Sequence, residues 1–158
     1  MELPKQRLRA HTAECGSKSL KSAVALKKGD VLCAFTGTFQ SQPTRHSIQV
    51  SDSDHMLVDP VELQYINHSC DPNVAFDVER REVRALRAIQ AGDEFFYFYP
   101  STEWDMAEPF ICNCGTARCL KLIRGAKHLP QDVLERYEFQ DHIQRRLPPV
   151  RRGREQTG

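Results

Sequence analysis

The sequence predicts a mainly β protein with short helices that ends in one C-terminal helix. Short apolar runs closed by turn or breaker residues fill the chain up to about residue 100, whereas apolar residues at helical spacing occur only after Pro130. The 158 residues, 40% of them hydrophobic, have the size and composition of one globular domain. No apolar run approaches the ~20 residues that a transmembrane helix needs, so we expect a soluble protein with no membrane partner.

Five segments before residue 100 have strand character. They are 30–35, 46–50, 55–59, 74–78 and 82–88. The last two flank a charged turn at 79–81 and alternate in polarity, which predicts a hairpin. Two Gly-Asp turns, at 28–30 and 91–94, precede apolar runs and mark strand starts.

The segment 129–148 has the pattern of one helix. Pro130 suits the first turn, and Phe139, Ile143 and Leu147 share one face before Pro148 ends the pattern. We expect the basic tail, 149–158, to be disordered and solvated. A nuclear address or a phosphate-binding patch is the alternative for its arginines, so nucleic-acid binding is only weakly predicted.

The net charge of +1 conceals an acidic middle between two basic ends. Residues 29–120 hold six Lys/Arg and fourteen Asp/Glu, whereas residues 1–28 hold seven and two, and residues 121–158 hold nine and five. This arrangement indicates a site for a cation and argues against a nucleic-acid groove through the centre, although a solvated surface explains charge blocks in most domains.

Three cysteines between residues 112 and 119 have the spacing of metal ligands, with Gly115 allowing a sharp turn between them. Tetrahedral zinc takes four N or S ligands, so the fourth must come from elsewhere in the chain. Cys70 is the best candidate for that ligand. Its competitors are Cys15, Cys33, His68 and His128.

The compartment bears on this interpretation of the cysteines. The first nine residues are charged with no apolar stretch behind them, so they do not resemble a signal peptide. We expect an intracellular location, cytoplasmic or nuclear, where clustered thiols bind metals more often than they form disulfides. Free surface thiols or partial disulfides are the alternative.

Three motifs in this order resemble the signature of SET-domain protein lysine methyltransferases. They are the run Asn67-His68-Ser69-Cys70-Asp71-Pro72-Asn73, the run from Gly92 to Tyr99, and the cysteine run, which is similar to the family's post-SET zinc motif Cys-x-Cys-x4-Cys. Residues 18–32 resemble the family's opening segment. The resemblance covers about residues 15–128. It implies a pseudoknotted β-clip SET domain at 15–107 and a zinc-bound post-SET segment at 108–128, between an N-terminal segment (1–14) and the C-terminal helix and tail.

The resemblance also implies the roles of individual residues. Tyr99 would be the catalytic tyrosine, and Tyr97 would limit the number of methyl groups added to one or two. The residues implied for binding S-adenosylmethionine are Lys18, Ser19, Leu20, Tyr65, Asn67, His68, Tyr99 and Phe110. The implied zinc ligands are Cys70, Cys112, Cys114 and Cys119.

The predicted function is therefore transfer of methyl groups from S-adenosylmethionine to a lysine of a protein, with histone tails among the candidate substrates. Lysine, with a pKa of about 10.4, must lose a proton before it attacks, and an apolar channel beside a sulfonium lowers that pKa. One alternative is an inactive SET-like binding module, because Ser17 and Ser19 stand where the family has glycines. A purely structural zinc module is the second alternative. The oligomeric state stays open.

Overall fold

The computed structural model describes residues 7–149 of the chain, in which short strands form five small sheets. The strands before residue 100 are β1 (Leu8–Thr12), β2 (Lys18–Ser22), β3 (Val31–Ala34), β4 (Thr36–Gln40), β5 (Ile48–Gln49), β6 (His55–Asp59), β7 (Asn67–His68), β8 (Val74–Asp77), β9 (Glu82–Ala85) and β10 (Phe96–Tyr97). Two 3-10 helices, η1 (Val61–Tyr65) and η2 (Tyr99–Ser101), follow β6 and β10. The β-rich expectation is confirmed.

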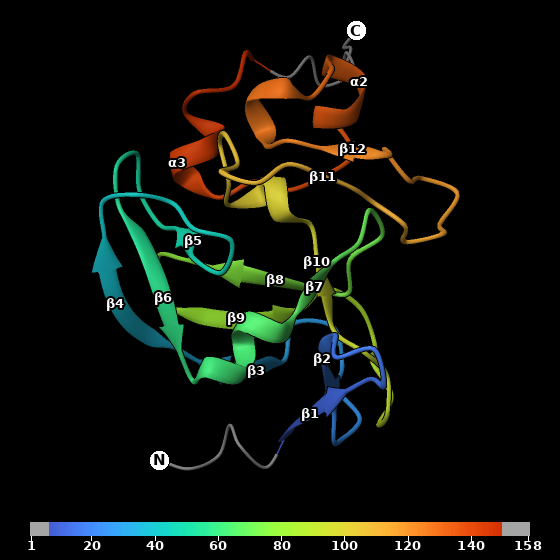
Figure 1. The fold of residues 1–158 in the computed structure, drawn as a ribbon. Helices are drawn as coiled ribbons and strands as arrows, with labels where there is room; N and C mark the ends of the chain where they lie inside the picture. Colours follow the sequence, from blue (N-terminus) through green and yellow to red (C-terminus); the bar gives the residue numbers. More distant parts are fainter. Residues whose placement is uncertain (1–6, 150–158) are drawn as a thin grey trace, which may run out of the picture.

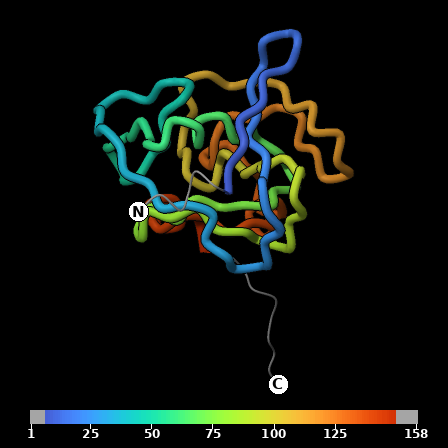
Figure 2. The backbone as a smooth tube through the Cα atoms, turned by 90° about the horizontal axis from the view of Figure 1, so that it is seen from below, coloured from blue at the N-terminus to red at the C-terminus, as the bar shows by residue number. Residues whose placement is uncertain are grey.

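Two three-stranded sheets form the body of the molecule (Figure 1). One has the order β3-β9-β8 and the other β4-β6-β5, with antiparallel pairing throughout. The hairpin of β1 and β2 projects from this body, as Figure 2 shows. This hairpin was not among the predicted strands, because β1 is almost entirely exposed and has no apolar alternation.

All five predicted strands are confirmed. The predicted hairpin is formed by β8 and β9, and Arg81 in its turn has a positive φ of 59°. The two Gly-Asp turns are built alike, because Asp30 and Asp93 each accept a backbone N–H three residues upstream. Gly29 and Gly92 supply φ values of +90° and +94° in these turns, a region that L side chains rarely occupy.

The largest hydrophobic cluster lies between these sheets and the segments that cross them. Phe76 at its centre is fully buried and packs edge-on against Phe35 and Tyr97, with ring centroids 5.6 and 4.6 Å apart. Such pairs add to the burial of two large apolar side chains. The β region therefore has an apolar core of its own.

Parallel pairing of β7 with β10 brings two distant segments together at the centre of the molecule (Figure 1). Asn67 pairs with Phe96 and His68 pairs with Tyr97. Next to this pair, the Ser69 N–H donates to the Tyr97 carbonyl oxygen at 3.1 Å. This places the Asn-His motif beside the Tyr-rich motif, as the resemblance implied.

The C-terminal elements cover the end of the sheets opposite the β1–β2 hairpin (Figure 1). They are β11 (Phe110–Ile111), β12 (Leu122–Ile123), η3 (Ala126–His128), α2 (Gln131–Leu134) and α3 (Asp141–Gln144). No helix within residues 7–149 is both long and apolar enough to cross a bilayer. Of the predicted tail at 149–158, all but residue 149 lies outside the described residues.

The segment 129–148 is helical in two single-turn pieces instead of the one continuous helix that the apolar spacing predicts. Tertiary contacts explain the break. The Tyr137 ring stacks on Phe98 with centroids 3.7 Å apart, and Gln140 adopts extended backbone angles before α3. The Gln140 N–H donates to the Ser101 carbonyl oxygen, and its side-chain oxygen accepts the Val78 N–H, both at 2.9 Å. These contacts with the β region override the local helical pattern.

Candidate functional site

A cleft with a volume of about 990 Å³ runs along the β7–β10 pair. Its walls come from the start of β2, the loop 44–48, η1, and the segment 106–114. Most of the predicted site residues line this cleft. They are Lys18, Tyr65, Asn67, His68, Tyr97, Tyr99, Phe110, Cys112 and Cys114.

Tyr99 is held by hydrogen bonds at both ends. Its hydroxyl donates to the Ile66 carbonyl oxygen at 3.1 Å, and its backbone N–H donates to His68 Nδ1 at 3.1 Å. Its ring packs edge-on against His68 and Phe110, with centroids 5.2 and 5.8 Å away. Burial raises the pKa of Tyr99 well above its ordinary value, so the hydroxyl stays protonated near neutral pH.

Tyr97 is 6% exposed and lies between the core and the cleft. Its ring centroid is 4.6 Å from that of Phe76 on the core side and 4.6 Å from that of Tyr99 on the cleft side. Burial raises the pKa of Tyr97 well above its ordinary value. The two tyrosines therefore present two neutral phenols, side by side, to one end of the cleft.

Asn67 joins the opening segment to the β7–β10 pair. Its Nδ2 donates to the Lys18 carbonyl oxygen at 3.0 Å and to Glu94 Oε2 at 3.3 Å. The Lys18 ammonium lies over the Tyr65 ring, 4.9 Å from its centroid. Three of the predicted binding residues thus meet where β2 begins.

His68 connects Tyr99 with the cysteine cluster. Because its Nδ1 accepts the Tyr99 N–H, the ring proton is on Nε2, which lies 3.4 Å from Cys70 Sγ. Burial lowers the pKa of His68 to about 3, so the imidazole is neutral. The Phe110 ring contacts its other side at 5.6 Å.

Ser19 and Leu20 are the two predicted binding residues that lie away from the cleft lining. Leu20 is completely buried in the core, and its carbonyl oxygen accepts the Phe95 N–H at 2.8 Å. Ser19 pairs with His11 in the β1–β2 hairpin. Within β2, Lys18 therefore lies at the cleft, whereas Ser19 lies in the hairpin and Leu20 in the core.

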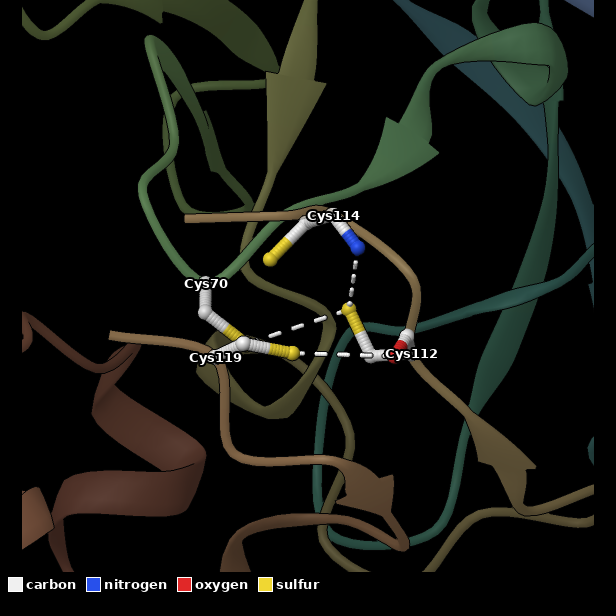
Figure 3. A group of neighbouring side chains, drawn as sticks. All are labelled: Cys70, Cys112, Cys114 and Cys119. Carbon is white, nitrogen blue, oxygen red and sulfur yellow. Dashed lines mark hydrogen bonds between the residues drawn. The ribbon is translucent and has the colours of Figure 1, made fainter. Parts of the chain in front are cut away.

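Four cysteines converge on one point, as Figure 3 shows, and two of them, Cys112 and Cys114, line the cleft. The sulfur atoms of Cys70, Cys112, Cys114 and Cys119 all lie within 4.8 Å of one another, and none is in a disulfide. Of the other candidates for the fourth ligand, His68 lies against the cluster, with Nε2 3.4 Å from Cys70 Sγ, and the remaining three lie elsewhere. Cys15 is exposed in the β1–β2 turn, Cys33 is buried in β3, and His128 bonds to Asp105 at 2.9 Å.

The cluster fits a zinc ion in its spacing and in its chemistry. Zinc–sulfur bonds of about 2.3 Å in a tetrahedron put the sulfurs ~3.8 Å apart, and Cys70 and Cys112 are 3.9 Å apart. Backbone N–H groups of Cys114 and Leu120 point at the sulfurs of Cys112 and Cys70, both at 3.3 Å. Burial raises the pKa values of Cys70 and Cys112, that of Cys112 to about 11, so these two thiols become thiolates only beside a cation such as zinc.

Glu103 is a cleft residue that the sequence analysis did not single out. It is 8% exposed, and its Oε2 accepts hydrogen bonds from the Gln49 N–H and the Thr102 hydroxyl, both at 2.8 Å. Burial raises the pKa of Glu103 to about 7. Nothing in the run Pro-Ser-Thr-Glu-Trp marks this carboxylate as a buried residue of the cleft.

Comparison with known proteins identifies several relatives. Methyltransferase flvH of Aspergillus flavus is 38% identical over 128 residues, which cover 79% of this chain and 71% of that protein. The H3 lysine-36 specific histone-lysine N-methyltransferase of Chaetomium globosum is 33% identical over 49% of this chain. Human histone-lysine N-methyltransferase 2B is 36% identical over 38% of this chain. The matched regions make up only 10% and 2% of these two histone methyltransferases.

The fold and a family comparison agree with these relatives. The crystal structure of KRYPTONITE in complex with mCHG DNA and SAH superposes with a TM-score of 0.56 at 20% identity, covering 75% of this chain and 30% of that one. A family model described as the SET domain matches residues 7–100, more than half of the 158 residues. The chain belongs to the SET-domain family.

Proposed function

We propose that this chain is an S-adenosylmethionine-dependent methyltransferase that acts on a lysine side chain of a protein. One observation carries the proposal: Tyr99, fixed through its hydroxyl to Ile66 and through its backbone to His68, lines a cleft of about 990 Å³. The SET-domain relatives that carry methyltransferase names support the same reaction.

The cleft has groups that suit each part of the methyl donor. S-Adenosylmethionine supplies a methyl group on a cationic sulfonium, together with a carboxylate and an adenine ring. Lys18 offers a cation for the carboxylate, Asn67 and His68 offer polar groups beside it, and Phe110 offers an aromatic face for the adenine. Tyr65 supports Lys18 through its ring.

Tyr99 and Ile66 act by position and electrostatics. The Tyr99 hydroxyl donates its hydrogen bond to the Ile66 carbonyl oxygen. The lone pairs of the hydroxyl oxygen therefore remain free to face a positive centre in the cleft. Oxygen atoms fixed in this way stabilise a cation without reorganising during the reaction. Zinc held by the four cysteines would fix the segment 106–114, which forms one wall of the cleft.

A histone tail is the substrate that we propose first. Relatives in Chaetomium globosum and Homo sapiens are named histone-lysine N-methyltransferases, whereas the name of the flvH protein gives no substrate. An intracellular location follows from this substrate. Division of the chain into a SET domain at 15–107 and a post-SET segment at 108–128 is part of the same proposal.

The experiment that tests the activity uses labelled S-adenosylmethionine with core histones and the Tyr99→Phe variant. We expect label on histone lysines with the wild-type protein, and a loss of about 100-fold or more in kcat with the variant, because one preorganised oxygen is removed from the reaction centre. Binding of S-adenosylhomocysteine and the melting temperature should change little. Equal rates in both proteins would contradict the role of Tyr99.

The same assay separates the alternative function. Ser17 and Ser19 in place of the family's glycines favour a module that binds but does not turn over. Such a module would bind a histone peptide or the donor by calorimetry and transfer no label to any substrate at any pH. A structural zinc module would bind neither.

The number of methyl groups should be limited by Tyr97. Its side chain lines the cleft beside Tyr99, and a phenol there can hold a water molecule in the space that a further methyl would need. We expect mainly mono- and dimethyl-lysine from the wild-type protein by mass spectrometry, and a raised trimethyl share with Tyr97→Phe. Ready trimethylation by the wild-type protein would remove this role.

A further inference from the structure

Glu103 is a buried acid in the wall of the cleft whose function the proposed reaction does not yet explain. It follows η2 and lies beside β5, because its Oε2 accepts the Gln49 N–H. The negative charge of Glu103 helps to raise the pKa values of both Tyr97 and Tyr99. Burying a carboxylate costs free energy, and buried acids with a shifted pKa are common at functional sites.

The two oxygens of Glu103 are in different situations. Oε2 accepts two hydrogen bonds at 2.8 Å, from Gln49 and Thr102, and these fix the orientation of the carboxylate. Oε1 has no hydrogen-bond partner within residues 7–149. It is not one of the fully buried atoms without a partner in that part of the chain, so it is partly accessible. Because Glu103 lines the cleft, its free oxygen is available to a ligand there.

The charged and titratable neighbours of Glu103 do not neutralise the negative charge on this oxygen. Tyr97 and Tyr99 are neutral phenols, and Arg45 on the opposite loop exerts its charge on Tyr99. His142, on α3, contacts the Thr102 carbonyl oxygen at 2.8 Å, and burial lowers its pKa, so it is neutral near pH 7. Gln49 and Thr102 carry no charge. Among residues 7–149, burial and the hydrogen bonds from Gln49 and Thr102 account for the shifted pKa of Glu103, and no cation contributes to it.

We propose that Glu103 binds the ammonium group of the incoming amine and takes its proton. This inference rests on the proposed methyltransferase function. In the first step an N–H bond of the ammonium breaks, its electron pair stays on nitrogen, and the proton bonds to Glu103 Oε1, giving a neutral amine and a carboxylic acid. The amine lone pair then forms the N–CH₃ bond while the S–CH₃ bond breaks and its electrons stay on sulfur. Glu103 returns its proton to water.

The chemistry of Glu103 suits both binding the ammonium group and accepting its proton. Burial raises its pKa to about 7, close to the pH at which a general base is most effective. An ordinary surface glutamate would be too weak a base, and the buried tyrosines stay protonated. The substrate class is therefore a cationic primary or secondary amine, which includes lysine and methyl-lysine.

The first arm of the test measures binding and does not depend on turnover. n-Butylammonium, which has the head group of a lysine side chain, is titrated into the protein at pH 8 with S-adenosylhomocysteine present, and NMR shifts are followed. We expect saturable millimolar binding to the wild-type protein, weakened at least about fivefold by Glu103→Gln. Glutamine can still accept both hydrogen bonds through its oxygen, so the variant should fold. Glu79→Gln, in the exposed β8–β9 turn, removes the same charge and should bind as the wild type does.

The second arm measures the methylation rate of core histones against pH. A base contributes ~100-fold or more, so Glu103→Gln should lower kcat about 100-fold at pH 7 and much less at pH 9.5, where the amine loses its proton unaided. Thr102→Val keeps the carboxylate but removes a hydrogen bond that lowers its pKa, so the lower limb of the profile should move to higher pH. A purely structural role would lower the rate equally at every pH.

The outcomes of the two arms are distinguishable. Equal n-butylammonium affinity in wild type and Glu103→Gln, or no binding to either, overturns the inference. An active wild-type enzyme with an unchanged pH profile in Glu103→Gln also overturns it, while the proposed function stands. Glu103-dependent binding without methyl transfer to any histone supports the ammonium site and removes the proposed function instead.

Discussion

In the β region, 18 buried residues between β2 and β10 form one hydrophobic cluster, whereas the cluster around the cysteines has three, Cys70, Cys112 and Ile123. The first region has enough apolar surface to fold by burying it. The second consists of two short strands and a loop around four sulfurs. Small segments of this kind are usually stabilised by a metal.

The cleft lies between these two regions, so its two walls differ in how they are stabilised. One wall, with Ile66 and Tyr97, belongs to the apolar core, and the other, with Phe110 and Cys112, belongs to the cysteine segment. His68 joins them through its bonds to Tyr99 and Cys70. The comparison predicts that one wall can be loosened while the other stays folded.

The largest effect should come from Cys112→Ser. Structural zinc contributes of the order of 10 kcal/mol to the folding of small zinc modules, and this segment has little else to hold it. We expect metal analysis to fall from about one zinc per chain to well below one. Amides of residues 110–123 should exchange at least ~100-fold faster, while those of β8 and β9 keep their protection.

Cys15→Ser is the matched control, because this exposed thiol lies outside the cluster. It should keep both zinc and exchange protection. Wild-type protein purified without any zinc, or a Cys112→Ser protein that loses the core together with the segment, would refute the division into two differently stabilised regions.

The next effect should come from Phe76→Ala in the apolar core. Removing a fully buried aromatic ring leaves a cavity beside Phe35 and Tyr97 and costs ~3–5 kcal/mol. Chemical denaturation should show this loss for the β region as a whole, with zinc still bound in the folded protein. A loss below about 1 kcal/mol would mean that this core is not what stabilises the β region.

The same contrast explains how much of the structure could be predicted from the sequence. The β8–β9 hairpin and β6 have alternating or apolar runs with clear turn residues, so local pattern sufficed. The spacing of Cys112, Cys114 and Cys119 identified a metal site, since local ligands leave a local signature. Cys70 was already the best of the five candidates for the fourth ligand, and the structure brings its sulfur to the other three.

Local sequence pattern was insufficient to predict the structure where tertiary contacts determine the conformation or burial of a residue. The helical spacing of 129–148 is real, but Tyr137 stacks on Phe98 and its hydroxyl donates to the Cys70 carbonyl oxygen at 2.6 Å, so the chain leaves the helix. Lys18, Ser19 and Leu20 were grouped as one binding segment, and in the structure Lys18 lines the cleft while the Leu20 side chain is buried in the core. Glu103 carries no local signature, because its burial comes from Gln49, 54 residues away in sequence.

The smallest effect should occur where α3 meets the β region, at a polar junction. His142 is 2% exposed and contacts the Thr102 carbonyl through Nε2, while the Nδ1 atoms of His142 and His55 are buried without partners among residues 7–149. Burial lowers the pKa values of both imidazoles, so both are neutral in the folded protein.

Below pH 6.5 the unfolded chain therefore binds protons that the folded chain does not, and these two groups lower stability as pH falls through that value. Glu103 acts in the opposite direction. Because burial raises its pKa to about 7, the folded chain takes up this proton between pH 7 and 4.5 before the unfolded chain does.

Comparing wild type with His142→Gln separates the two contributions, since Glu103 is common to both proteins. Between pH 7.5 and 5.5 the melting temperature of the wild type should fall by ~2–4 °C more than that of the variant, which corresponds to ~1 kcal/mol for a chain of this size. Substitution of the exposed His11 by Gln should leave the wild-type pH dependence unchanged. Parallel pH curves for wild type and His142→Gln would mean that His142 is not held neutral at this junction.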